Sequence, residues 1–301
     1  MTLAFAVAAS IPPEPPFVMV AADSRLSLGN ETHSDTGIKI CELGGRTAMV
    51  AAGQALPVFT AAEVVRPIVE NHNRREAPAM LGFYDTVRLL AFFLKRAAEQ
   101  QAWSCEVGVA GFLSSGVPTL AHIIVSPTRN KATFFSVQSD GMRSIPIGDR
   151  PAARFLMQGL AVAKRDRKPV LTSGLSLLWY MSQHPGAFGS IGGGVAVGQC
   201  AARDQAFSWP IVEFAGRRFL RGIDVTPYYR PSWPPPLVVP YDEEWCSELD
   251  QKVTLQEGTI QPVPVSGSSY EIDSMSAPDT LFQTHNDPEA FDGIACTPPG
   301  G

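Results

Sequence analysis

Four residues in the first part of the chain have the types needed for nucleophilic catalysis by an N-terminal residue. Thr2 follows Met1 directly, so removal of Met1 would leave a threonine with a free α-amine beside its hydroxyl. The amine, with an unperturbed pKa of about 7.7–8.0, could take the hydroxyl proton as the oxygen attacks a carbonyl. Two charged residues, Asp23 and Lys39, and a glycine after a hydrophobic run, Gly53, complete the set.

The other three residues have roles in such chemistry, and each also has a plainer interpretation. An ammonium beside the hydroxyl, here Lys39, would lower the cost of the developing alkoxide and disfavour protonation of the amine. Asp23 would pair with Lys39 and keep it charged and oriented, or the two form only a structural ion pair. Gly53 would let a backbone N–H approach the tetrahedral oxyanion, or it is a turn glycine between a strand and a helix. For Thr2 the alternative is an ordinary second residue.

The composition predicts one large core with a smaller second region. Of the 301 residues, 45% are hydrophobic, and the net charge of −5 gives no indication of nucleic-acid binding. Residues 226–301 carry 12 acidic and 2 basic residues, which leaves 17 of the 29 acidic and 22 of the 24 basic residues in 1–225. This asymmetry predicts an acidic tail that lies against its own core or against a neighbour's.

Neither a metal site nor a membrane segment is expected. The five cysteines form no C-x-x-C pair and the histidines have no metal-pair spacing, so we expect reduced thiols, no metal and no cofactor. No Lys or Arg precedes Arg25, which argues against a signal peptide. No apolar run reaches the roughly 18–20 residues of a membrane span. These features predict a cytoplasmic protein.

Hydrophobic periodicity predicts strands, two helices, strands, two helices and strands, in that order. Helices outside two sheets give a fold of the α+β class, a four-layer α-β-β-α sandwich, over residues 2–225. Residues 226–301 are Pro-rich and acidic, and we expect a mostly disordered or draped tail. Strands are predicted at 2–9, 17–22, 37–41, 47–52, 106–113, 119–125, 132–137, 192–197, 211–214 and around 219, and helices at 56–71, 86–100, 151–164 and 173–183.

Taken together, the early residues resemble the proteasome β-type subunits and their bacterial relative HslV, in the N-terminal nucleophile (Ntn) hydrolase superfamily. Members open T-T-x-V-x-V, and here T-L-A-F-A-V begins at Thr2. Their second strand ends A-A-D-x-R, which is A-A-D-S-R around Asp23 here. The spacings from Asp23 to Lys39 and from Lys39 to Gly53 are those of the family. The resemblance is clearest over residues 2–59 and looser up to about residue 225.

The resemblance implies roles for further residues. Arg25 would support the site, while Ser27 and Ala55 would line an extended cleft and offer backbone hydrogen bonds to a substrate strand. The primary specificity pocket would be bounded by small or apolar residues, which favours an uncharged substrate side chain. These pocket residues are Leu26, Gly37, Cys41 and Ala51.

The later part of the chain departs from the family pattern at two motifs. Active members carry G-S-G before the third helix, with the serine supporting the threonine amine, and here G-D-R places Asp149 at that position. Members also carry D-x-x-S-G-G, whereas F-G-S-I-G-G-G over residues 188–194 lacks the aspartate and has its serine at Ser190. Asp149 or Ser190 could substitute for the missing groups.

The function implied by the resemblance is a threonine endopeptidase that forms an acyl-enzyme on Thr2. Relatives work as closed rings, which implies a homo-oligomeric ring that acts on peptide or protein substrates, delivered by an ATPase or regulator. Two alternatives stay open: a non-catalytic ring or scaffold subunit of the same fold, and an Ntn amidohydrolase that acts on a small amide. Thr2, Asp23 and Lys39 argue against the scaffold, and the missing serine and aspartate argue for it.

Overall fold

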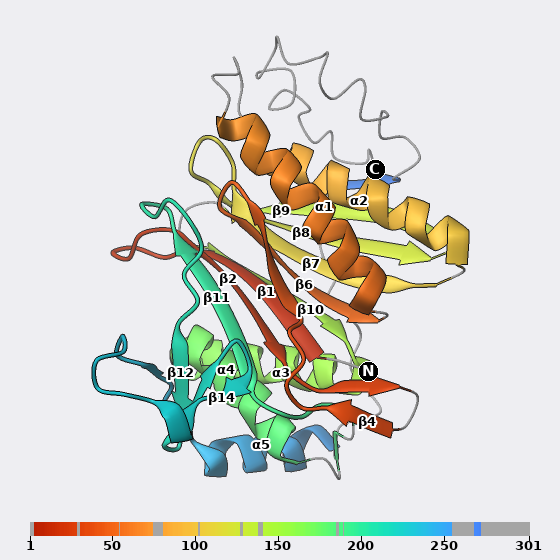
Figure 1. Cartoon of the computed structure of the whole chain (residues 1–301). Coiled ribbons are helices and arrows are strands. Elements are labelled where there is room, and N and C mark those ends of the chain that lie inside the picture. The colour runs from red at the N-terminus through yellow and green to blue at the C-terminus, as the bar shows by residue number, and fades with distance from the viewer. Residues whose placement is uncertain are drawn as a thin grey trace, which may run out of the picture.

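Two β-sheets lie face to face, with helices covering both outer sides (Figure 1). The predicted four-layer α-β-β-α sandwich of the α+β class is confirmed. Helices α1 (Ala55–Arg74) and α2 (Phe83–Gln101) cover one sheet, and α3 (Arg150–Arg165) and α4 (Val170–Gln183) cover the other. The computed structural model describes residues 3–28, 31–53, 55–74, 81–101, 103–126, 129–137, 141–184, 187–188, 190–254 and 268–271.

The first sheet brings together strands from distant parts of the chain. Its order is β10-β1-β2-β11, and every pair in it is antiparallel. Strand β1 is therefore hydrogen-bonded on both sides, which fixes the start of the described chain inside the sheet. The strands are β1 (Leu3–Ser10), β2 (Phe17–Asp23), β10 (Gly141–Gly148) and β11 (Val195–Ala201).

The second sheet has the order β16-β9-β8-β7-β6-β5 and is also antiparallel throughout. Five of its strands follow the chain order as a meander, interrupted by α1 and α2 between β6 and β7. Its sixth strand, at the β9 edge, comes from the C-terminal part of the chain. The strands are β5 (Ile40–Gly44), β6 (Thr47–Gly53), β7 (Cys105–Phe112), β8 (Pro118–Ser126), β9 (Arg129–Ser136) and β16 (Ser268–Glu271).

Side-chain size alternates along β1 and sets the distances between the layers. Because successive strand residues point to opposite faces, one set of β1 side chains meets the other sheet and the alternate set meets the helices. The inter-sheet set is Ala4, Ala6 and Ala8, while the larger Leu3 and Phe5 belong to the core beneath α3 and α4. Small residues between the sheets let them pack closely, and large ones fill the space under the helices.

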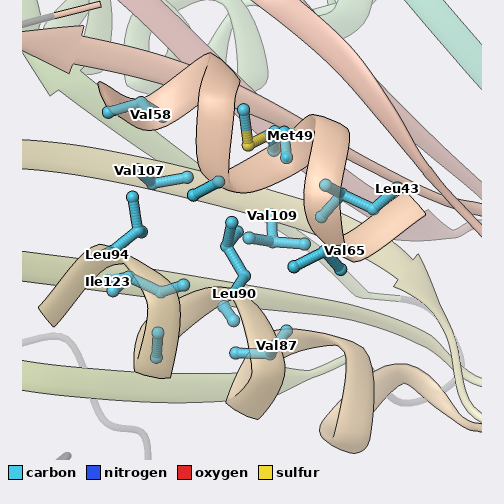
Figure 2. Packing of buried hydrophobic residues seen from close by; sticks show 14 of the residues in the cluster. Leu43, Met49, Val58, Val65, Val87, Leu90, Leu94, Val107, Val109 and Ile123 are labelled. Atoms are coloured by element: carbon cyan, nitrogen blue, oxygen red, sulfur yellow. The ribbon is translucent and has the colours of Figure 1, made fainter. Parts of the chain in front are cut away.

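Helices α1 and α2 bury a continuous apolar surface against the six-stranded sheet (Figure 2). Val65 of α1 and Leu90 of α2 are fully buried and share one cluster with Val109 of β7. The apolar spacing that predicted helices at 56–71 and 86–100 is thus the spacing of the face turned toward the sheet. Both predicted helices are confirmed, with a few more residues at their ends.

A fifth helix, α5 (Glu243–Thr254), packs against α3 and α4, on the side of the sandwich away from α1 and α2. This helix was not predicted from the sequence. Asp242 caps it by accepting a hydrogen bond from the Trp245 amide at 2.9 Å, a common helix-start signal. Leu249 of α5 and Leu177 of α4 both reach Gly159 of α3, where an added Cβ would lie 2.9 and 2.3 Å from their methyl carbons. The part of the acidic tail that precedes residue 255 therefore contributes to this core.

Two predicted strands begin later than expected. The structure starts β5 at Ile40 rather than at residue 37, and β11 at Val195 rather than at residue 192. In both places glycines leave the ladder: the Gly37 amide bonds to the Ser24 carbonyl, and Gly193 has a positive φ of 74°. Strand β10 was not predicted.

The remaining described elements are short. A small sheet has the order β14-β13-β12-β15, and a separate hairpin pairs β3 with β4. No helix among the described residues is long and apolar enough to cross a membrane. These short elements are β3 (Leu26–Leu28), β4 (Glu31–Ser34), β12 (Ile211–Phe214), β13 (Arg217–Leu220), β14 (Ile223–Asp224), the 3₁₀ turn Thr226–Tyr228 and β15 (Leu237–Val238).

We expect Leu249→Ala to lower the free energy of unfolding by about 2–5 kcal/mol, because Leu249 is 4% exposed and its loss leaves a cavity between three helices. Chemical denaturation of the full chain measures this change. The matched control is Gln251→Ala, an exposed position on the same helix, which should stay within about 0.5 kcal/mol of wild type. Equal stability of the two variants would contradict the packing of α5.

Candidate active site

Asp23, the last residue of β2, is the centre of the site. It is fully buried, and its carboxylate accepts four hydrogen bonds. Oδ1 receives the Leu3 amide at 3.0 Å and Lys39 Nζ at 2.9 Å. Oδ2 receives the amides of Arg25 at 3.2 Å and Gly192 at 3.3 Å. One side chain thus joins the start of β1, the segment before β5 and the loop before β11.

Burial removes the charged groups of both Asp23 and Lys39 from water. Lys39 is only 2% exposed, and burial lowers its pKa, opposed by the attraction of Asp23. Burial likewise raises the pKa of Asp23, opposed by Lys39 and by the amides of Leu3 and Gly192. A lysine whose pKa is lowered releases its proton more readily than a surface lysine. The site therefore holds a buried lysine whose charge depends on its pairing with Asp23.

Backbone contacts fix Lys39 between the two sheets. The Gly37 amide donates to the Ser24 carbonyl at 2.7 Å, which ties the segment before β5 to the end of β2. The Ala51 amide donates to the Lys39 carbonyl at 3.1 Å, which ties the same segment to β6. The lysine side chain is thereby directed toward Asp23 and the start of β1.

The glycine loop, residues 192–194 before β11, borders the site on the side away from β5. The Gly194 amide donates to Ser24 Oγ at 2.7 Å, and Ser24 Oγ in turn donates to the Asp35 carbonyl. A Cβ on Gly193 would lie 2.3 Å from Ser24 Oγ, so only glycine fits there. Sequence analysis missed Ser24 as a site residue, although its position beside Asp23 and the G-G-G run were both visible.

The Arg25 side chain lies against this loop. Its guanidinium lies where a side chain on Gly192 would be, 2.2 Å from an ideal Cβ at that residue. Nε binds Asp35 Oδ1 at 2.7 Å, and this hydrogen bond raises the pKa of Arg25. Asp35 was not anticipated from the sequence.

Gly53 ends β6 in a conformation that favours glycine. Its φ is 101°, and an added Cβ would lie 2.8 Å from the Ser104 carbonyl oxygen. The residue pairs with Cys105 of β7 and leaves the strand just before α1. This geometry agrees with both sequence interpretations, an exposed oxyanion donor and a turn glycine.

The predicted specificity residues separate into two groups. The Leu26 side chain lies over Gly37, with Cγ 2.2 Å from an ideal Cβ there. Cys41 and Ala51 are buried in the core beneath α1 and α2. Thr2 and the side chains of Ser27 and Ala55 lie outside what the structure describes.

Asp149 and Ser190, the two candidates to substitute for the missing family groups, contact each other. Ser190 Oγ donates to Asp149 Oδ2 at 2.9 Å. Asp149 is also the N-cap of α3, where Oδ1 accepts the Ala152 amide at 3.0 Å. It directly follows Gly148, the residue that pairs with Leu3.

A cavity of about 370 Å³ adjoins the glycine loop at Gly193 and Gly194. Two ion pairs line it, Arg25 with Asp35 and Arg217 with Asp224. The lining is therefore polar but balanced in charge. Among the described residues, no three His, Cys, Asp or Glu side chains are grouped so that they could hold a metal ion.

An α-β-β-α sandwich whose N-terminal strand begins beside a buried Asp–Lys pair defines the class as the Ntn-hydrolase fold. Residues 15–144 match the model of the proteasome subunit family. This match confirms the predicted resemblance to the proteasome subunits over this part of the chain. No curated protein matches the chain.

The buried thiols should be inert in the folded protein. Burial raises the pKa of Cys41 to about 11 and that of Cys105 and Cys246 to about 12. At pH 8 the reactive thiolate of Cys41 is then about one part in a thousand, and it increases only as the pH approaches 11. Alkylation with iodoacetamide at pH 8 followed by peptide mapping should modify these three residues only after unfolding. Rapid alkylation of Cys41 in the native state would reveal a competing nucleophile.

Proposed function

We propose that this proteasome-family chain is a threonine peptidase whose nucleophile is Thr2, exposed by removal of Met1. The observation that carries the proposal is that Asp23 Oδ1 accepts two hydrogen bonds. That oxygen binds both Lys39 Nζ and the amide of Leu3, the residue covalently attached to Thr2. The buried ammonium is thereby held close to the start of β1, where it can act on a side chain at the preceding position.

The chemistry follows from these positions. Thr2 Oγ attacks the substrate carbonyl carbon and passes its proton to the Thr2 α-amine, while Lys39 stabilises the forming alkoxide. The Gly53 N–H stabilises the tetrahedral oxyanion. Collapse of the intermediate breaks the C–N bond, and the α-ammonium gives its proton to the leaving amine. Water then attacks the acyl-enzyme by the reverse proton route and releases the acid.

The proposed assembly and setting follow the family. Proteasome subunits assemble into rings, so we propose a homo-oligomeric ring in the cytoplasm, with a peptide or protein substrate and an ATPase or regulator that delivers it.

The competing function is a non-catalytic ring or scaffold subunit. One observation favours it: the family match ends at residue 144, before the two motifs in which Asp149 and Ser190 replace the family's groups. A scaffold would keep the fold and the Asp23–Lys39 pair as a structural tie. The two functions differ in whether Thr2 becomes a free, reactive N-terminus.

Labelling with a peptidyl β-lactone tests the proposal. We expect the intact mass of the wild-type protein to show loss of Met1 and one adduct, mapped to Thr2. Thr2→Ala should lose labelling by at least about 100-fold, because no nucleophile remains, and Thr2→Ser is the control that should keep it. Retained Met1, or a folded wild-type protein without an adduct, would leave the scaffold function.

A further inference from the structure

The glycine loop carries no charge of its own. From residue 185 to residue 194 the chain has no acidic or basic side chain. The loop nevertheless borders the buried Asp23–Lys39 pair, and Gly192 donates its amide to Asp23 Oδ2 at 3.3 Å. This amide helps to satisfy a carboxylate that is fully removed from water. Any charged group that holds the loop in place must therefore come from another segment.

Asp35, which follows β4, supplies such a group. Its carboxylate binds the Arg25 guanidinium at two points: Oδ1 accepts from Nε at 2.7 Å, and Oδ2 accepts from Nη2 at 3.3 Å. Bidentate pairing of this kind fixes the orientation of a guanidinium as well as its position. The guanidinium fills the space that a side chain on Gly192 would occupy. Asp35 therefore holds Arg25 against the first glycine of the loop.

The backbone of Asp35 contacts the other end of the glycine loop. Its carbonyl accepts a hydrogen bond from Ser24 Oγ, and the same Ser24 oxygen accepts the Gly194 amide at 2.7 Å. A Cβ on Gly193 would clash with the Asp35 carbonyl oxygen. Two residues after Asp35, the Gly37 amide donates to the Ser24 carbonyl at 2.7 Å. The carboxylate of Asp35 is thus carried by a backbone that is itself fixed.

The four charged side chains at this corner form two pairs, one buried and one open to solvent. Lys39 and Asp23 are 2% and 0% exposed, whereas the Asp35 side chain is 47% exposed. Burial lowers the pKa of Lys39, and Asp23 opposes this change. The outer charges have smaller effects on the same pKa: Arg25 lowers it and Asp35 raises it. Without the Asp35 carboxylate, the charge of Arg25 would act on Lys39 uncompensated.

We propose that Asp35 is a positioning residue of the active site, which holds Arg25 against the glycine loop and so fixes the Gly192 amide on Asp23. For its effect on catalysis, this inference rests on the proposed function. The role is indirect: Asp35 keeps in place an amide that satisfies Asp23, and it compensates the Arg25 charge beside Lys39. A surface ion pair that only added stability would do neither.

Hydrogen exchange of the peptide that contains residues 192–194, followed by mass spectrometry, tests the positioning without needing peptidase activity. Asp35→Asn keeps the size of the side chain and removes its charge, so we expect exchange in this peptide to become at least about 10-fold faster. The matched control is Asp224→Asn, which breaks the other ion pair of the same cavity and should leave this exchange unchanged. Both variants should keep the wild-type urea midpoint, because exposed ion pairs contribute little to global stability.

The pH dependence of β-lactone labelling tests the effect on Lys39. Labelling of Thr2 should slow at high pH as Lys39 loses its proton. Loss of the Asp35 charge lowers the pKa of Lys39, so this alkaline limb should move to lower pH in Asp35→Asn, by about half a unit to one unit. The double variant Arg25→Gln/Asp35→Asn removes both outer charges. It should return the limb toward its wild-type position while exchange in the loop stays fast.

The outcomes separate this inference from the proposed function. Where wild-type Thr2 is labelled, unchanged loop exchange or an unmoved alkaline limb in Asp35→Asn would overturn this inference alone. The Arg25–Asp35 pair would then be an ordinary surface contact. A wild-type protein that keeps Met1 would overturn the proposed function, and the exchange experiment would still decide whether Asp35 holds the loop.

Discussion

The buried pair of Asp23 and Lys39 is the interaction on which the rest of the site depends. Removing two charges from water is costly, and such a pair persists only where hydrogen bonds satisfy it. Here the carboxylate accepts from Leu3, Arg25 and Gly192 as well as from Lys39. Apart from the neighbouring Arg25 amide, these donors come from three other segments of the chain, so satisfying one carboxylate fixes the positions of those segments relative to β2.

The layers of the sandwich make this convergence possible. Alanines on the inner face of β1 let the two sheets approach, which brings the end of β2 and the segment before β5 within reach of a lysine side chain. The larger residues on the outer face of β1 anchor it beneath α3 and α4. The start of β1 is consequently held by packing on both faces and by hydrogen bonds on both edges.

Much of the fold could be predicted from the sequence because burial imposes simple periods. The alternation in residues 3–9 and the helical spacing around Val65 and Leu90 follow directly from the faces they bury. The ion pair of Asp23 and Lys39 was also predicted, from residue types and spacings that resemble a family's catalytic pattern. What periodicity could not show were the partners that tertiary contacts supply, such as Ser24 and Asp35.

Tertiary contacts also explain why β5 and β11 begin later than the sequence predicted. Residues 37–39 and 192–194 lead directly into the apolar runs of β5 and β11, but the amides of Gly37, Gly192 and Gly194 donate to Ser24 and Asp23 instead of to a neighbouring strand. Such tertiary hydrogen bonds override local preference and occur at the functional end of the sheet. Helix α5 was missed because its short apolar face lies within an acidic, proline-rich composition.

A double-mutant cycle on the free energy of unfolding tests the central claim most directly. Asp23→Asn and Lys39→Met keep the shapes of the side chains and remove one charge each. Each single variant should lose about 3–5 kcal/mol, because it leaves a buried charge unpaired, whereas the double variant should lose far less than the sum. Additive losses would show that the two side chains do not depend on each other, and would contradict the account of the pair as the tie that holds the site together.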